Sequence, residues 1–183
     1  MSASPTIRLA TNKDIPAMLE IYAPYVINTA ISFEKEVPSL EEFRQRVDQV
    51  LQEAPWMVYE INDTIVGYAY ASTHRGRSAY RWNREVSAYV SETHQRKGVG
   101  RALYKEMFEI LKKQGYLNLL AGITLPNPSS IAFHESMGFT PVGVYHGVGF
   151  KFGKIIDTGW WEMKIQDEGF RPGVILPLEQ ATS

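Results

Sequence analysis

The chain has 183 residues, 44% of them hydrophobic and 21% charged, which is the composition of a globular domain large enough to bury a core. Its formal net charge of −1 excludes a general attraction to nucleic acid or to anionic membranes, so any basic site must be local. The absence of cysteine excludes disulfides, cysteine metal sites and an acyl-cysteine intermediate. Because the sequence also lacks a signal-peptide-like apolar run near its start and an apolar stretch of about 20 residues, we expect a cytoplasmic protein.

Apolar periodicity predicts strands and helices in the order β-α-α-β-β-β-α-β-α-β-β. The elements are expected at residues 6–10, 11–26, 39–53, 56–61, 64–73, 85–90, 99–113, 117–125, 127–138 and, roughly, 141–151 and 155–165. Ser39 and Glu42 have the spacing of a capping box at the start of the second helix, and Thr11 and Asp14 have it at the first. This mixture predicts an α/β fold in which helices cover a central mixed sheet.

Residues 94–104, HQRKGVGRALY, place two glycines and two cations before a long helix. Glycines cost chain entropy there, and Arg96 and Lys97 add positive charge where the helix macrodipole is already positive. A bound phosphate would offset both costs, because it could accept hydrogen bonds from the first helical turn and pair with the cations. The loop is neither a dinucleotide fingerprint, since Leu103 stands where the third glycine should be, nor a Walker loop. A plain glycine turn is the alternative interpretation.

Two motifs together carry a resemblance to a known family. QRKGVG, followed by NPSSIAFHESMGF, resembles the acetyl-CoA-binding core of the GNAT superfamily of N-acetyltransferases. RGRSAYRWNREVSAYV, GFKFGKIIDTGWW and RPGVILPL are similar to segments of its phosphinothricin N-acetyltransferase group, so the resemblance covers about residues 6 to 178. It implies a single N-acetyltransferase domain over 1–183, with a core at about 6–165 and a tail at 166–183. It also implies a GNAT-like, mostly antiparallel mixed sheet with helices on both faces.

The resemblance implies acetyl-CoA as co-substrate and assigns its contacts to a strand end, the glycine loop and a helix start. These contacts are Ala88, Tyr89, Val90, Gln95, Arg96, Lys97, Gly98, Val99, Gly100, Asn127 and Ser130. The loop amides would hold the pyrophosphate, and the strand would pair with the pantetheine arm. A backbone N–H near Val90 would polarise the thioester carbonyl. For Asn127 and Ser130, simple helix capping is an equally good interpretation.

Two residues are candidates for proton transfer. Glu85 begins the strand beside the expected thioester and matches the group's proposed general base, acting directly or through water. His134 stands where many GNAT enzymes have a tyrosine that protonates the thiolate, and its unperturbed pKa of about 6.5 suits proton transfer at neutral pH. Whether His134 gives or takes a proton is left open. The structural alternatives are a solvated strand-end carboxylate and a hydrogen-bonded helix histidine.

The loop at 74–84 concentrates positive charge in a chain of net charge −1. Such a loop suggests an anionic acceptor, because arginine binds carboxylate or phosphinate groups in a bidentate manner. By the resemblance, the substrate contacts are Phe33, Arg75, Arg77, Tyr80, Trp82 and Ser87. Arg81 and Arg84 depart from the group's pattern and could alter the choice of acceptor. The alternatives are a solvated basic loop and, for Phe33, a side chain that belongs to the core.

We therefore expect an acetyltransferase that acts on the α-amine of a small anionic or tetrahedral-headed amino acid, such as phosphinothricin, methionine sulfoximine or methionine sulfone. Without a cysteine to relay the acetyl group, the amine should attack directly in a ternary complex. One alternative is a protein N-terminal or lysine acetyltransferase, for which an acidic groove is expected. Another is a non-catalytic acyl-CoA sensor, which the retention of Glu85 and His134 disfavours.

The remaining expectations concern partners and metals. Four histidines without H-x-x-x-H spacing predict no metal site. Neither nucleic acid nor a membrane is expected as a partner, since the basic loop is too small a patch. The family resemblance implies a homodimer.

Overall fold

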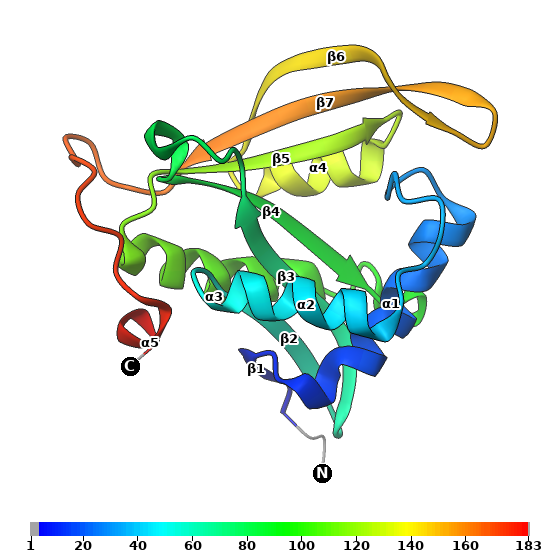
Figure 1. The fold of residues 1–183 in the computed structure, drawn as a ribbon, viewed down its shortest axis with the longest axis horizontal. Helices are drawn as coiled ribbons and strands as arrows, with labels where there is room; N and C mark the ends of the chain where they lie inside the picture. The colour runs from blue at the N-terminus through cyan, green and yellow to red at the C-terminus, as the bar shows by residue number, and fades with distance from the viewer. Residues whose placement is uncertain (1–3, 183) are drawn as a thin grey trace.

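The computed structural model describes residues 4–182, in which seven strands form one sheet in the order β1-β2-β3-β4-β5-β7-β6 (Figure 1). The strands are β1 (Thr6–Leu9), β2 (Trp56–Ile61), β3 (Thr64–Thr73), β4 (Asn83–Val90), β5 (Asn118–Leu125), β6 (Thr140–Lys151) and β7 (Lys154–Lys164). The helices are α1 (Ile15–Asn28), α2 (Leu40–Leu51), α3 (Val99–Gln114), α4 (Pro128–Ser136) and α5 (Leu178–Ala181), with short 3₁₀ turns η1 (Asn12–Asp14), η2 (Ser78–Tyr80) and η3 (Glu92–His94). The predicted order is confirmed, and α5 in the tail was not predicted.

The sheet is mixed and mostly antiparallel, as predicted, because β4 and β5 form its one parallel pair within the described residues. That pairing is short. It runs from Asn83 opposite Asn118 to Glu85 opposite Leu120. Beyond Glu85 the two strands separate, and Figure 1 shows β4 and β5 diverging. A gap therefore opens in the middle of the sheet.

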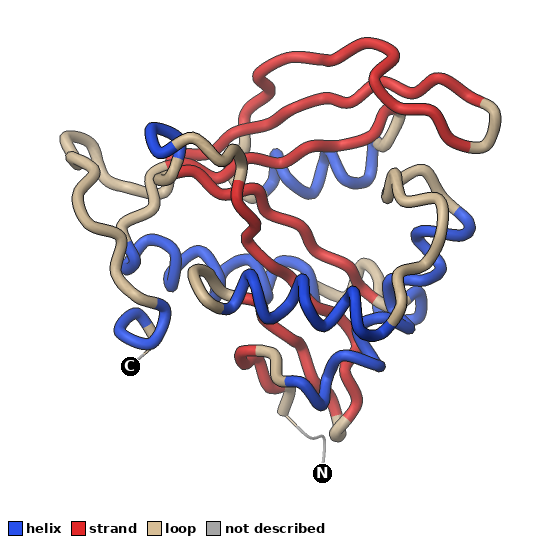
Figure 2. Tube along the Cα trace, in the orientation of Figure 1, coloured by secondary structure: helices blue, strands red, loops and turns tan. Residues whose placement is uncertain are grey.

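Helices cover both faces of the sheet, as predicted (Figure 2). On one face, α1 and α2 bury Met18, Val26 and Phe43 against the aromatic side chains of β2 and β3. On the other face, the apolar stripe of α3, including Leu103 and Met107, forms the larger core together with α4. Each face thus has a separate apolar cluster, and the gap between β4 and β5 lies between them.

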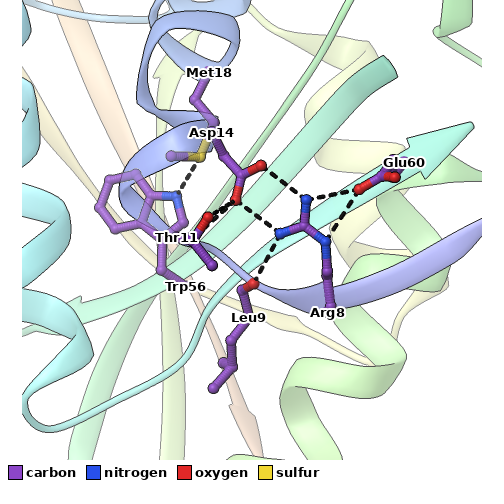
Figure 3. A network of polar contacts seen from close by, with 7 residues as sticks. All are labelled: Arg8, Leu9, Thr11, Asp14, Met18, Trp56 and Glu60. Atoms are coloured by element: carbon purple, nitrogen blue, oxygen red, sulfur yellow. Dashed lines mark hydrogen bonds and ion pairs between the residues drawn. The ribbon is translucent and has the colours of Figure 1, made fainter. Parts of the chain in front are cut away.

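An ion-pair network fixes the start of α1 (Figure 3). The Asp14 carboxylate accepts two hydrogen bonds from Arg8, at 2.7 and 2.8 Å, and two more from the N–H and hydroxyl of Thr11. Burial opposes ionisation of Asp14, but the hydrogen bonds from Arg8 and Thr11 outweigh it and lower its pKa. Since Arg8 also binds Glu60, the network ties β1 and β2 to the helix.

The second predicted capping box is also confirmed. The Ser39 hydroxyl accepts from the Glu42 N–H at 3.2 Å, and the Glu42 carboxylate accepts from the Ser39 N–H at 2.8 Å. The hairpin between β2 and β3 turns at Asn62 and Asp63, which both have positive φ. These local signals place α2 and the hairpin where the sequence predicts them.

Candidate functional site

The edge of β4 that faces the gap carries the backbone groups of alternate residues. The Ser91 N–H donates to Val66 O on β3, so odd-numbered residues at this end of β4 direct their backbone groups toward β3. Those of Ala88 and Val90 therefore face the gap, whereas those of Tyr89 face β3. The ring of Tyr89 instead packs into the aromatic cluster under α1. Of the three predicted strand contacts, Ala88 and Val90 thus present their backbone to the gap.

Tyr25, on α1, is a site residue that the sequence analysis missed. Its hydroxyl donates to Val90 O at 2.6 Å and lies 3.4 Å from the Val90 N–H nitrogen. It also accepts a hydrogen bond from the Gln95 side chain at 3.0 Å. A cavity of about 590 Å³ adjoins Tyr25 and is lined by α1, the start of β3 and residues 91–95. No local sequence signal could identify Tyr25, because its partners lie 65 and 70 residues further along the chain.

The glycine loop leads into α3 through two residues of left-handed conformation, Arg96 at φ 58° and Gly98 at φ 85°. Gly98 is the N-cap and supplies no side chain, so the first-turn N–H groups of α3 have no side-chain acceptor. The predicted contacts Gln95, Arg96, Lys97 and Gly98 are all exposed around them. This end of the helix combines free donors, a positive dipole end and two cations, which suits an anion such as a pyrophosphate.

The next two residues of the loop face the protein rather than solvent. Val99 is buried, and it occupies space left by Gly67 on β3, where an added Cβ would lie 2.8 Å from the Val99 side chain. Gly100 lies against the ring of Phe133 on α4, which an added Cβ would meet at 3.4 Å. Their side-chain positions thus serve the packing of α3, and only their backbone can serve a ligand.

Glu85 is the last residue of β4 that pairs with β5, so its carboxylate lies where the gap begins. Its Oε1 is 2.7 Å from Nδ1 of His74. The side chain is 32% exposed, and Oε2 has no hydrogen-bond partner among residues 4–182. Ser87 shares its face of the strand, by the alternation of β4. The carboxylate is therefore held on one side and open on the other.

His134 lies on the opposite face, between α3 and α4, and is 7% exposed. Its Nδ1 donates to the Ser130 carbonyl at 2.8 Å, and its Nε2 therefore accepts from the Tyr104 hydroxyl at 3.2 Å. Phe133 and Phe139 pack edge-on against the ring. Burial lowers the pKa of His134, which the hydrogen bond to Ser130 offsets in part. The ring is a neutral imidazole with both nitrogens engaged.

Asn127 and Ser130 form the cap of α4. The Asn127 side chain accepts from the Ser130 N–H at 3.1 Å, and the Ser130 hydroxyl lies 3.3 Å from Nδ1 of His134. The capping interpretation is therefore confirmed for both residues. Their contact with a cofactor stays a prediction.

The predicted acceptor loop has two different parts. Arg75 and Arg77 are exposed, and the Arg75 guanidinium lies 5.6 Å from the ring centre of Tyr80. Trp82, in contrast, is half-buried, and its Nε1 donates to the carbonyl of Gly173 in the tail at 2.9 Å. The first part of the loop can thus reach a ligand, while Trp82 anchors the tail.

Arg84 does not belong to the exposed basic loop. It is 5% exposed, and its guanidinium binds Glu53 and Thr73 at 2.7 and 2.8 Å and lies over the ring of Tyr116. Because its guanidinium is held by these partners, Arg84 is not part of the exposed basic surface, and its effect on the choice of acceptor stays a prediction. The strand begins at Asn83, two residues before the predicted start, so Arg84 is its second residue, and this place in β4 explains its burial.

Phe33 joins the loop between α1 and α2 to the β6–β7 hairpin. Its ring covers Gly149 on β6 so closely that a Cβ there would overlap it. Lys151, on the same strand, is buried and donates to the carbonyls of Val26 and Ser32, each at 2.7 Å. Since Phe33 is 39% exposed, its ring remains partly available to a ligand beside this joint.

Residues 4–182 contain neither a membrane-spanning helix nor a cluster of metal-ligating side chains. No helix in this range has the length and apolar character needed to cross a bilayer. Nor does the same range contain a group of three or more histidine, aspartate or glutamate side chains that could hold a metal ion.

Comparison with known proteins agrees with this geometry. The model of the family described as "Acetyltransferase (GNAT) domain" matches residues 7–160. The chain is 34% identical, over 85% of each sequence, to phosphinothricin N-acetyltransferase of Streptomyces viridochromogenes. It is 32% identical to the L-methionine sulfoximine/L-methionine sulfone acetyltransferase of Salmonella typhimurium, over 88% of this chain and 95% of that one.

A solved structure extends the likeness to three dimensions. The GNAT superfamily phosphinothricin acetyltransferase from Sinorhizobium meliloti, in complex with acetyl-CoA, superposes with a TM-score of 0.87 at 32% identity. The match covers 93% of this chain and 94% of that one. With its family match over residues 7–160 and these relatives, the chain belongs to the GNAT family of acetyltransferases.

Proposed function

We propose that this enzyme transfers the acetyl group of acetyl-CoA to the α-amine of a small anionic or tetrahedral-headed amino acid. Phosphinothricin, methionine sulfoximine and methionine sulfone are the acceptors named for its relatives. The observation that carries the proposal is the position of Glu85. Its half-exposed carboxylate begins the gap in the sheet, and the anion-binding loop lies beyond the far end of the same strand.

In this proposal, different groups of the chain bind different parts of the two substrates along the gap. The first-turn N–H groups of α3, with Arg96 and Lys97, hold the pyrophosphate, and the backbone of Ala88 and Val90 pairs with the pantetheine arm. Acetyl-CoA supplies an activated acetyl group as a thioester. Arg75 and Arg77 hold the anionic head of the acceptor.

Glu85 takes a proton from the acceptor's ammonium group, and the resulting amine nitrogen attacks the thioester carbonyl carbon. The C–S bond then breaks, and the thiolate takes up a proton. His134, the other candidate for proton transfer, has both ring nitrogens engaged, so supplying that proton would require one of these hydrogen bonds to break. Its catalytic role therefore stays a prediction that a variant can test.

The proposal extends to assembly and location. The β6–β7 hairpin ends the sheet and exposes apolar side chains, with Phe150 at 60% and Ile155 at 75%. An apolar edge of this kind supports a homodimer in which a second copy covers it. A chain without cysteine supports the cytoplasm as its location, and the whole chain, 1–183, forms one catalytic unit.

The test is thiol release from acetyl-CoA across a panel of amines. The panel holds phosphinothricin, methionine sulfoximine, methionine sulfone, glutamate, its one-carbon-longer homologue and a lysine peptide. We expect turnover only on the tetrahedral-headed or acidic amino acids. Turnover only on the peptide would overturn the small-molecule proposal, and tight binding of acetyl-CoA without turnover on any amine would indicate a sensor.

A further inference from the structure

The carboxylate of Glu85 has one protein partner among the described residues, and it is a histidine from the preceding loop. Nδ1 of His74 lies 2.7 Å from Oε1, across the hairpin that joins β3 to β4. The histidine is the more buried of the two, at 16% exposure against 32% for Glu85. His74 thus contacts the carboxylate from the protein side and leaves its other oxygen toward the gap.

The imidazole itself is held by aromatic rings from two elements. Tyr80, in η2, and Trp160, on β7, meet it edge-on with ring centres 6.1 and 5.9 Å away. Trp160 rests in turn on Gly122 of β5, where an added Cβ would lie 3.2 Å from the indole. Because β5 and β7 form the far side of the gap, the position of His74 depends on both halves of the sheet.

The partners of His74 also assign its tautomer. Arg75 Nε, which always carries a hydrogen, donates to Nε2 at 3.3 Å. Nε2 must therefore be the bare nitrogen, and the ring proton is on Nδ1, where it donates to Glu85. A neutral imidazole satisfies both contacts, whereas a charged one would set two N–H groups against each other.

We propose that His74 is a positioning residue for acetyl transfer: it holds Oε1 of Glu85 so that Oε2 faces the acceptor's ammonium group. This inference rests on the proposed function, since it takes Glu85 as the base. In the reaction one ammonium proton moves to Oε2, the nitrogen lone pair forms the C–N bond, the C–S bond breaks, and the departing thiolate takes up the second proton that the nitrogen loses. The proton on Nδ1 of His74 stays in place throughout.

Two substitutions separate the hydrogen bond from the packing. His74→Phe keeps a ring between Tyr80 and Trp160 but removes the donor, while His74→Asn removes the ring and keeps an N–H near the place of Nδ1. The assay uses the acceptor of the panel that the wild type acetylates fastest. We expect H74F to lower kcat about tenfold and to change the KM for acetyl-CoA and the KM for the acceptor by less than about twofold each. We expect H74N to recover at least half of the lost kcat. A merely structural ring would give the reverse order, with H74F active and H74N impaired, and would overturn the proposal.

A double-mutant cycle with Glu85→Gln tells the two proposals apart. If His74 acts through Glu85, adding H74F to E85Q lowers the residual kcat by less than about twofold. A full additional tenfold loss would show that His74 acts independently, and would overturn the inference. If E85Q alone keeps the wild-type kcat, the assignment of the base fails instead. If E85Q loses kcat but H74F does not, the base stands and only the role of His74 is lost.

Discussion

Two histidines lie on opposite faces of the split sheet, and their surroundings differ in almost every respect. His74 pairs with a half-exposed carboxylate that has a free oxygen, whereas His134 is buried and bonds to a carbonyl and a tyrosine hydroxyl. The first arrangement leaves a reactive group available, and the second uses every polar atom within the fold. The same residue type can thus serve chemistry on one face and packing on the other, and its partners decide which.

The largest effect should come from removing the open carboxylate. We expect Glu85→Gln to lower kcat about a hundredfold, because a general base contributes at least that much, with little change in Tm. The matched control is Glu135→Gln, which alters a carboxylate on the α4 side that accepts from Trp161 at 3.2 Å. Thiol-release kinetics and thermal unfolding of both variants check this. Equal losses of kcat in the two variants would contradict the assignment of the catalytic base to the face that carries Glu85.

Placing phenylalanine at the buried histidine should reverse the pattern expected at His74. His134→Phe leaves the Tyr104 hydroxyl and a lone pair of the Ser130 carbonyl without their partner in a buried site. We expect a loss of about 1–3 kcal/mol in the free energy of unfolding, measured by urea titration, and less than a tenfold change in kcat. A larger kcat loss at unchanged stability would assign His134 the thiolate proton and make the two faces alike in function.

The smallest effect is a pH dependence of stability from His134. Its pKa is lowered in the folded protein, so below its ordinary value of about 6.5 the unfolded chain binds a proton that the folded chain does not. The contribution of His134 to the free energy of unfolding is therefore complete above that value. It is lost as the pH drops from 7 to 5, by at most about 1.4 kcal/mol per pH unit. Urea titrations across this range should give a flatter profile for His134→Phe. Identical slopes would show that other groups cause the decline.

The order of the elements could be predicted from the sequence because its signals are local. The Ser39–Glu42 box, the Asn62–Asp63 turn and the glycine at position 98 each act within a few residues. The partnerships of the site are of another kind. Tyr25 meets Val90 across 65 residues, and His74 meets Glu85 only because β3 and β4 pair in one register. A periodic pattern carries no information about such pairs.

Which of the charged side chains are buried could not be predicted from the sequence either. Arg84 follows other arginines in an exposed loop, yet the start of β4 turns it inward to Glu53 and Tyr116. A one-residue shift of the strand would have pointed it to the opposite face. The resemblance to a family could supply the candidate site residues, whereas the distinction between Arg77 in solvent and Arg84 in the core required the fold.

The short pairing of β4 with β5 has a consequence for self-association. A strand edge with free N–H and C=O groups is a template for another chain, and proteins commonly blunt such edges at the rim of a sheet. Here the free edge lies inside the sheet, between β4 and β5, rather than at its rim. The Tyr25 hydroxyl covers its end at Val90, and under the proposed function the pantetheine arm pairs with the rest. Under the proposed function, the acetyl donor would therefore also protect the protein, because it would fill an edge on which a neighbouring chain could otherwise aggregate.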